Sequence, residues 1–242
     1  MKPVPSTVGI LTMGTLVKAA IVVTSVLFAS VSSAQTPAHG VQEFRKTGTF
    51  EVPAGVSQVT VELWGAGGAG AGGNVGGIAP GSGGGGGGSG SYLKAILAVK
   101  AGEVYTIEIG RGGQGGPGES GKGPGLGENG GDSSIRRGTQ ALLQARGGRG
   151  GLAGRSGGRG GAGGRAPDTT GAITRAGNPG TDGHIGGHTE WTSISGGNGG
   201  AAVRGSVDPP GSFGGVGGAG KLITDGAESG KPGGDGSAIV SW

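Results

Sequence analysis

The clearest pattern of hydrophobic and polar positions lies in residues 50–68, FEVPAGVSQVTVELWGAGG. Phe50 and Val52 alternate with polar residues, and residues 53–55 have the proline and glycine composition of a turn. Between residues 58 and 64, valine and leucine then alternate with threonine, glutamate and tryptophan. This pattern predicts a β-hairpin whose second strand is half-buried.

Similar short apolar stretches return at residues 92–99, 104–109, 142–145 and 238–242. Their alternation and their β-branched and aromatic residues are typical of strands. The sequence therefore predicts a mainly β protein with a small antiparallel β-sandwich-like base. The strands of that base are expected in residues 48–63, 91–109, 132–146 and 236–242.

Glycine-dominated insertions separate these strands, and in several of them a glycine falls on every third position. The run at 147–165 has Gly148, Gly151, Gly154, Gly157, Gly160 and Gly163 in this register. A three-residue period matches the polyproline-II helix, and a bare glycine face lets neighbouring backbones approach closely enough to hydrogen-bond. We expect the insertions to form a bundle of polyglycine-II helices. The alternative is a set of flexible linkers, because glycine loses much conformational entropy on ordering.

Composition limits the class of protein. The chain has 242 residues, 68 of them glycine, with 12 prolines and no cysteine. A collagen triple helix would need a strict glycine period over the whole chain and much more proline. Without cysteine there is no disulfide, so a thin hydrophobic core must be supplemented by some other interaction.

The N-terminus has the features of an export signal. Lys2 and Lys18 carry positive charge, residues 19–29 are mostly apolar, and small residues end the stretch at Ala34. We expect cleavage after Ala34, a linker at 35–46 and a glycine-rich domain at 47–242. Cleavage lowers the net charge from +4 to +2 and leaves no expected transmembrane segment. The expected location is secreted or cell-surface, or the periplasm.

Residues 50–70, FEVPAGVSQVTVELWGAGGAG, resemble the glycine-rich domain of bacteriophage tail-tip adhesins and of exported bacterial glycine-rich proteins. The resemblance extends to YLKAILAVKAGEVYTIEIGRGG at 92–113, GGDSSIRRGTQALLQARGG at 130–148 and GGDGSAIVSW at 233–242. It implies a small β-rich base, a polyglycine-II bundle, and loops between the helices that bind a surface protein or saccharide. The chain differs from the phage proteins in its signal-like N-terminus and its lack of an evident fibre-attachment domain.

Several motifs have a known chemistry but lack its context. Residues 65–70 read GxGxxG, although no helix pattern follows and the next acid is Glu103, so no dinucleotide cofactor is expected. The pair His184 and His188 has a metal-ligand spacing, but flanking glycines disfavour the helix that this spacing needs, so no metal is expected. No catalytic motif is recognisable, and we expect no enzyme.

Arginine recurs through residues 146–165 in an RGG-like pattern without aromatic residues between. Because RNA-binding segments of this kind use aromatic side chains for base stacking, no nucleic acid is expected. These arginines are interpreted as solvated side chains, with an anionic polysaccharide, a lipid head group or extracellular DNA as the alternative ligands.

The sequence predicts a non-enzymatic, adhesin-like surface-binding module that recognises a glycan or an envelope protein through its connecting loops. The loops at about 165–195 and 203–213 contain exposed aromatic and polar candidates. The candidate ligand-binding residues are Trp191, Phe213, His184, His188, Arg175 and Arg204. The alternative function is a structural component of the matrix or cell envelope that self-associates through its glycine helices.

Overall fold

The computed structural model describes residues 39–76, 81–119, 124–186, 194–205, 217–218, 220 and 226–242. Residues 35–242 form one compact unit, and the predicted signal segment at 1–34 lies outside the described residues. No helix in the described part of the chain has the length and apolar character needed to cross a membrane.

The described residues form nine strands and no helix. They are β1 (Val41–Phe44), β2 (Gly48–Glu51), β3 (Gln58–Trp64), β4 (Tyr92–Ala98), β5 (Val104–Glu108), β6 (Ser133–Arg137), β7 (Gln140–Ala145), β8 (Ile173–Arg175) and β9 (Ser237–Ser241). A five-stranded sheet has the order β1-β9-β3-β4-β8, and a four-stranded sheet has the order β2-β5-β6-β7. All pairings are antiparallel, which confirms the prediction of a mainly β protein.

The two sheets share one hydrophobic core. Val59, Val61 and Leu63 of β3 are at most 1% exposed, and so are Tyr105 and Ile107 of β5 in the other sheet. These side chains come from alternate positions on each strand, so each sheet buries one face against the other. The residues that the sequence pattern assigns to the core are therefore the ones that hold the sheets together.

The predicted hairpin at residues 50–63 is wrong. Phe50 of β2 pairs with Tyr105 of β5, whereas β3 pairs with β4 and β9 in the other sheet. The connection itself is apolar, because Val52 and Val56 are 2% and 6% exposed. It packs into the core and carries the chain from β2 in the four-stranded sheet to β3 in the five-stranded sheet.

The prediction of a half-buried β3 holds only for its first residues, where Gln58 and Thr60 are exposed or partly exposed. Glu62 and Trp64 alternate with the core residues and should face solvent, but they are 5% and 0% exposed. Residues 203–205 cover them: the Trp64 Nε1–H donates to the Val203 carbonyl at 2.9 Å. This outer face of the five-stranded sheet thus has a small apolar cluster of its own, formed by Trp64, Tyr92 and Val203.

Two strands lie in segments without a strand-like pattern. Residues 41–44, within the range assigned to a linker, form β1 and pair with β9. Residues 173–175, within a range assigned to a loop, form β8 and pair with β4. Both are short edge strands in which most side chains are exposed, so hydrophobic alternation does not mark them.

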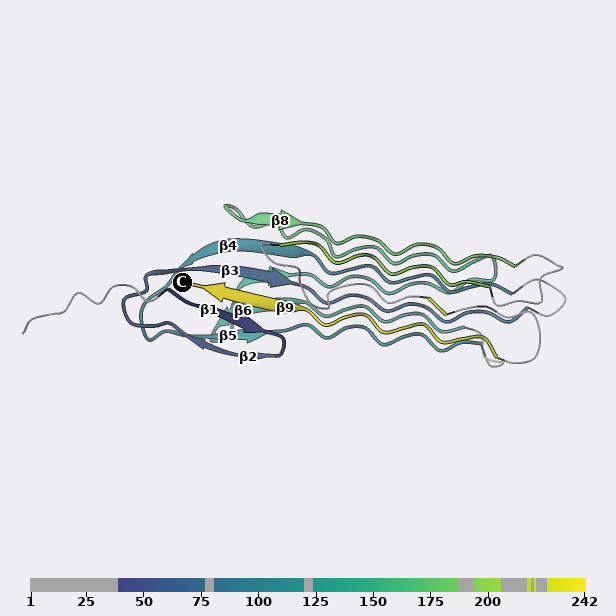
Figure 1. Cartoon of the computed structure of the whole chain (residues 1–242), viewed down its shortest axis with the longest axis horizontal. Coiled ribbons are helices and arrows are strands. Elements are labelled where there is room, and N and C mark those ends of the chain that lie inside the picture. The colour runs from purple at the N-terminus through teal and green to yellow at the C-terminus, as the bar shows by residue number, and fades with distance from the viewer. Residues whose placement is uncertain are drawn as a thin grey trace, which may run out of the picture. The chain divides into compact units, whose positions relative to one another are not determined.

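The glycine-rich insertions continue from the strand ends and run side by side (Figure 1). We call the following ranges the glycine segments: 65–73, 83–91, 110–118, 125–131, 146–152, 158–165, 177–184, 195–200 and 227–236. Segment 65–73 shows how the glycine segments interact, because its successive N–H groups donate to carbonyl groups of three different segments in turn. Gly65, Gly68 and Ala71 donate to segment 83–91. The residue that follows each of these three donates to segment 125–131, and the residue after that donates to segment 227–236.

Carbonyl groups of segment 65–73 in turn accept N–H donors from segments 110–118 and 146–152 and from Gly218. Segment 65–73 therefore lies among six other stretches of chain, and its donors change partner with a period of three residues. Glycine is required because a Cβ on Gly68 would come within 2.2 Å of the Arg149 carbonyl oxygen. The backbone contacts of these segments replace the side-chain core that the composition lacks.

Candidate functional site

Connections between glycine segments meet at the end of the segments that lies away from the sheets, which we call the tip. The described tip residues are 74–76, 81–82, 152–158, 183–186 and 194–195. Single β-bridges join Asn74 to Ser82 and Ser82 to Ile185, and the Ser82 hydroxyl donates to the Gly154 carbonyl at 2.5 Å. One buried serine thus links three connections that are far apart in the sequence.

His184 is the one predicted site residue that the structure places at the tip. Its side chain is exposed, and its Nδ1 lies 3.1 Å from the Ser195 hydroxyl. Its backbone N–H donates to the Ser195 carbonyl, and its carbonyl accepts from Gly83. Among the described residues, no carboxylate is hydrogen-bonded to His184. The contacts between His184 and Ser195 therefore link segments 177–184 and 195–200. His188, Trp191 and Phe213 lie outside the described residues.

Arg175 and Arg204 lie near the sheets. The Arg175 Nη1 donates to the Arg204 carbonyl at 2.9 Å, and the guanidinium lies 5.9 Å from the Tyr92 ring centroid. His184 bonds to Gly83, nine residues before Tyr92, so at about 3.1 Å per residue the two places are roughly 28 Å apart. The arginine pair and His184 therefore do not form one site.

The arginine pair lies beside a buried polar group on the outer face of the five-stranded sheet. Glu62 accepts a 2.6 Å hydrogen bond from the Tyr92 hydroxyl and forms a 3.2 Å ion pair with Lys94. Gly205 fits over them because a Cβ there would come within 2.2 Å of the Trp64 ring. This arrangement attaches residues 203–205 to the sheet. The Glu62 carboxylate already has a hydrogen-bond donor, Tyr92, and a cation, Lys94.

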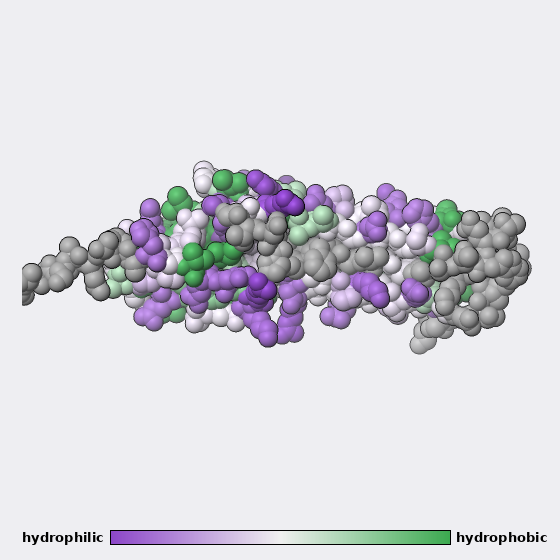
Figure 2. Space-filling model, in the orientation of Figure 1, coloured by the Kyte–Doolittle hydropathy of each residue, from purple (hydrophilic) through white to green (hydrophobic). Residues whose placement is uncertain are grey.

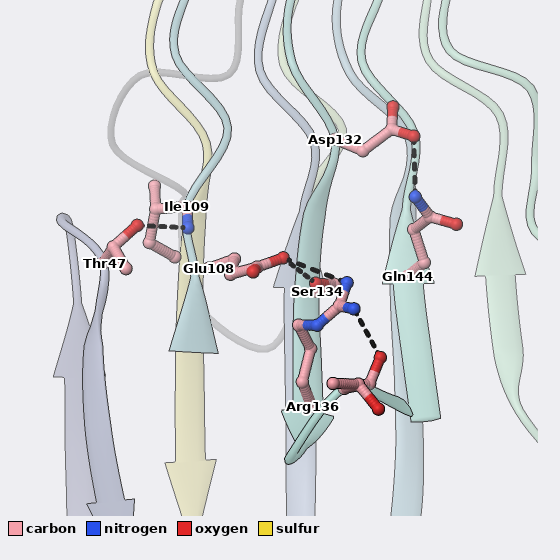
Figure 3. A network of polar contacts seen from close by, with 8 residues as sticks. Thr47, Glu108, Ile109, Asp132, Ser134, Arg136 and Gln144 are labelled. Atoms are coloured by element: carbon pink, nitrogen blue, oxygen red, sulfur yellow. Dashed lines mark hydrogen bonds and ion pairs between the residues drawn. The ribbon is translucent and has the colours of Figure 1, made fainter. Parts of the chain in front are cut away.

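Side-chain acceptors bond to outward-facing N–H groups of the glycine segments, a feature that the sequence analysis missed. Asp235 accepts from Gly112 at 2.8 Å, Asn129 from Gly150 at 3.0 Å, and Asp182 from Gly160 at 2.7 Å. Asp132 accepts from Gly147 and from Gln144 on β7, as Figure 3 shows for the second contact. The spacing of Asn129 and Asp132, three residues apart between glycines, is the signal that could have revealed these caps.

Hydrophilic residues extend along the glycine segments on the face of the molecule drawn in Figure 2. The outer face of the four-stranded sheet is also polar: Glu108 accepts from the Ser134 hydroxyl at 2.8 Å and pairs with Arg136 at 3.4 Å (Figure 3). The Glu108–Arg136 ion pair is partly exposed and therefore contributes little to stability. These polar residues provide a solvated surface and no enclosed reaction site.

The GxGxxG motif at 65–70 lies inside the array of glycine segments. All nine N–H groups of segment 65–73 donate to carbonyl groups of neighbouring segments, so this backbone has no free donor for a phosphate group. The described residues contain no cluster of three metal-ligating side chains. A cleft of about 450 Å³ near the sheets is lined by His39, Gln58, Thr60 and Trp242 among others, without any acidic side chain.

Glu103 and Tyr105 are hydrogen-bonded to each other and have shifted pKa values. The Tyr105 hydroxyl donates to the Glu103 carboxylate at 2.6 Å, and the Lys100 N–H donates to the same oxygen at 3.0 Å. The hydrogen bond from Tyr105 is the main cause that lowers the pKa of Glu103. Burial, followed by the Glu103 carboxylate, raises the pKa of Tyr105.

These two shifts predict a limited pH range of full stability. Tyr105 stabilises the fold as a neutral phenol, so its contribution is complete below the ordinary tyrosine pKa of about 10 and is lost as the pH rises through the higher folded-state pKa. Glu103 acts in the opposite sense: its contribution is complete above about pH 4.3 and is lost as the pH falls through its lowered pKa.

Urea midpoints measured across the pH scale would test this prediction. We expect Tyr105→Phe to flatten the alkaline limb of the stability profile and Glu103→Gln to flatten the acidic limb. An alkaline limb unchanged in Tyr105→Phe would contradict the assignment to this phenol.

Comparison with known proteins identifies a family and leaves the ligand open. A family model described as a glycine-rich domain matches residues 43–242, which includes every strand from β2 onward and all the glycine segments. No curated protein matches the chain.

Proposed function

Because the chain belongs to the glycine-rich domain family, we propose that it is an exported, non-enzymatic, adhesin-like module that binds a surface glycan or envelope component through its tip. The base of two sheets fixes the register of the glycine segments. The glycine segments carry the connections between them to the tip, and these connections present the binding residues.

The observation that carries this proposal is the joining of separate connections at the tip by Ser82, Asn74, Ile185 and Gly154. Loops held on a rigid support are the usual location of binding residues, because the support limits the entropy lost on binding. Residues 187–193, which include His188 and Trp191, join two tip segments in the sequence. Trp191 is our main candidate for ligand contact, with stacking on a sugar ring as its role.

The finer fold that we propose for the glycine segments is a polyglycine-II bundle. Its support is the change of hydrogen-bond partner at each residue of segment 65–73, which repeats after three residues. A helix with three residues per turn directs successive N–H groups to three different neighbours in this way. Such a bundle would hold the tip connections rigidly without a hydrophobic core.

A structural, self-associating component is the alternative, and the caps on the glycine segments disfavour it. Association between bundles needs free N–H groups at the bundle surface, as pairing between sheets needs free edges. Asp235, Asp182 and Asn129 instead occupy such groups within the chain. The capped surface thus favours a module that remains separate and binds through its tip.

Binding of labelled protein to a glycan array and to intact bacterial cells tests the proposal. We expect saturable binding that Trp191→Ala weakens at least about tenfold, equivalent to about 1.4 kcal/mol. Phe213→Ala tests a different connection, since residues 206–216 start from the outer face of the sheet at Gly205. The matched control is Ile96→Ala, which removes a 69% exposed apolar side chain from β4, a strand of the base.

Folded protein that binds no surface but assembles as its concentration rises, measured by sedimentation velocity, would contradict the adhesin proposal and support the structural alternative. Equal loss of binding in Trp191→Ala and Ile96→Ala would also contradict a binding site at the tip.

A further inference from the structure

Four of the RGG-like arginines lie on two neighbouring glycine segments, and Arg155 lies at the turn between these segments. The Arg149 N–H donates to the Ala162 carbonyl at 2.9 Å, and the Leu152 N–H donates to the Arg159 carbonyl at 2.8 Å. Partner numbers fall as donor numbers rise, so segments 146–152 and 158–165 are antiparallel, with a turn at 155–156 between them. The fold therefore converts a linear run of arginines into two adjacent rows.

The arginine positions are the outward positions of both rows. A Cβ on Gly148 would lie 2.1 Å from the Gly88 carbonyl oxygen, and one on Gly161 would lie 2.2 Å from that of Arg149. Interior positions thus accept only glycine, while the arginines are exposed. We call this surface the arginine strip; its members are Arg146, Arg149, Arg159 and Arg165.

The arginine strip has positive charge without paired counter-charge. Within the described part of the chain, none of its four side chains forms an ion pair. The acids on the adjoining segments have other roles: Asp132 accepts from the Gly147 N–H and Asp182 from the Gly160 N–H. The guanidinium groups consequently face solvent and can bind an external anion.

The backbone fixes the spacing of these charges. The Arg149 N–H and carbonyl both make hydrogen bonds to other segments, to Ala162 and Gly88 respectively. Residues three apart in a row are about 9 Å apart at a rise of about 3.1 Å per residue. A guanidinium binds a carboxylate or a sulfate group through two parallel N–H donors, so a rigid row of arginines suits a ligand with regularly repeated anionic groups.

We propose that the arginine strip binds a linear acidic polysaccharide, with carboxylate or sulfate groups, lying along segments 146–152 and 158–165. Residues 146–165 contain no aromatic side chain for base stacking, which favours a polysaccharide over single-stranded nucleic acid. This surface is on the side of the glycine segments and is separate from the tip. Its ligand is therefore independent of the surface component proposed for the tip.

Titration with heparin and with alginate, which have sulfate and carboxylate groups respectively, tests this proposal. In the strip variant, Arg146, Arg149, Arg159 and Arg165 are changed to glutamine. The control variant removes four positive charges elsewhere, by changing Arg45, Lys46, Arg111 and Lys231 to glutamine. We expect the strip variant to bind at least about tenfold more weakly than the unaltered chain and with a smaller salt dependence, since fewer counter-ions are released. The control variant should stay within about twofold, because long-range effects are screened at physiological salt.

Equal losses in the two variants would overturn the proposal, because they would show a response to net charge alone. Absence of binding to both polysaccharides by the folded chain would also overturn it. Duplex DNA and vesicles containing an anionic lipid are the comparison ligands, and binding to either of them without polysaccharide binding would reject the assigned partner. Retention of surface binding through Trp191 in the strip variant separates this result from a failure of the tip proposal.

Discussion

Replacement of Gly85 by alanine is expected to lower the free energy of unfolding by about 2–3 kcal/mol or more. A Cβ on Gly85 would lie 1.9 Å from the Arg159 carbonyl oxygen and 2.3 Å from its carbon, so two backbones must separate. Alanine also restricts the unfolded chain, which would add only about 0.4–1 kcal/mol of stability. The destabilisation from the steric clash is larger, because the atoms in contact are backbone atoms. They make hydrogen bonds between glycine segments and cannot rotate away.

Chemical unfolding of a graded set of variants measures this effect. In Gly131→Ala the nearest atom is the Arg111 nitrogen at 3.1 Å, so a displacement of a few tenths of an ångström suffices and we expect a smaller loss. Arg149→Ala removes an exposed side chain from a neighbouring segment and should change stability by less than about 0.5 kcal/mol. If Gly85→Ala unfolds at the same denaturant concentration as the unaltered chain, backbone packing does not hold segment 83–91 in place.

The sequence is informative about the strands because their hydrophobic residues alternate over at least four positions. Residues 58–64 are a clear example and form the long central strand β3, whereas residues 92–98 are marked by a nearly continuous apolar run and form β4. The pattern does not reveal which strands pair, because Phe50 and Val61 are equally apolar whether they lie in one sheet or in two facing sheets. Pairing depends on the connection at 53–57, whose buried Val56 directs the chain across the core.

The short strands β1 and β8 are hidden for a different reason. Val41 is 72% exposed and Ile173 is 57% exposed, so these strands are fixed by backbone pairing with β9 and β4 and not by burial of their side chains. In the glycine segments the three-residue period is visible in the sequence, whereas the assignment of neighbours is not. Segment 65–73 contacts chain as distant as residue 234, and a repeating glycine pattern fits any neighbour equally well.

For the candidate site residues, too, the sequence does not show which of them lie close together. Histidine and arginine side chains can bind ligands, which makes these residues candidates in the sequence, but only the fold separates His184 at the tip from Arg175 and Arg204 near the sheet. The burial of Glu62 was equally hidden, since the residues that cover it are about 140 positions away, around Val203. Contacts between segments that distant have no local sequence signal.

Trp64→Ala is expected to lower the free energy of unfolding by about 3–5 kcal/mol, the usual range for loss of a buried tryptophan. Trp64 is fully buried on the outer face of the sheet, where its ring centroid lies 5.1 Å from that of Tyr92. Trp64→Phe keeps an aromatic ring but removes the donor to the Val203 carbonyl. A buried acceptor left without a partner costs about 1–3 kcal/mol, so this variant should be intermediate in stability.

The position of Trp64 also predicts a local effect that a change in the main core should not reproduce. Because Trp64 holds Val203 against the sheet, we expect trypsin to cleave after Arg204 faster in Trp64→Phe, at temperatures well below unfolding.

Phe50→Leu is the matched control, since Phe50 lies between the sheets and does not belong to the cluster around Val203. If cleavage after Arg204 is equally fast in the two variants at equal stability, the opening is global and Trp64 has no special role in attaching residues 203–205. Preferential cleavage in Trp64→Phe would instead mean that the outer face is a separate, weaker unit, since its cluster of Trp64, Tyr92 and Val203 is far smaller than the core between the sheets.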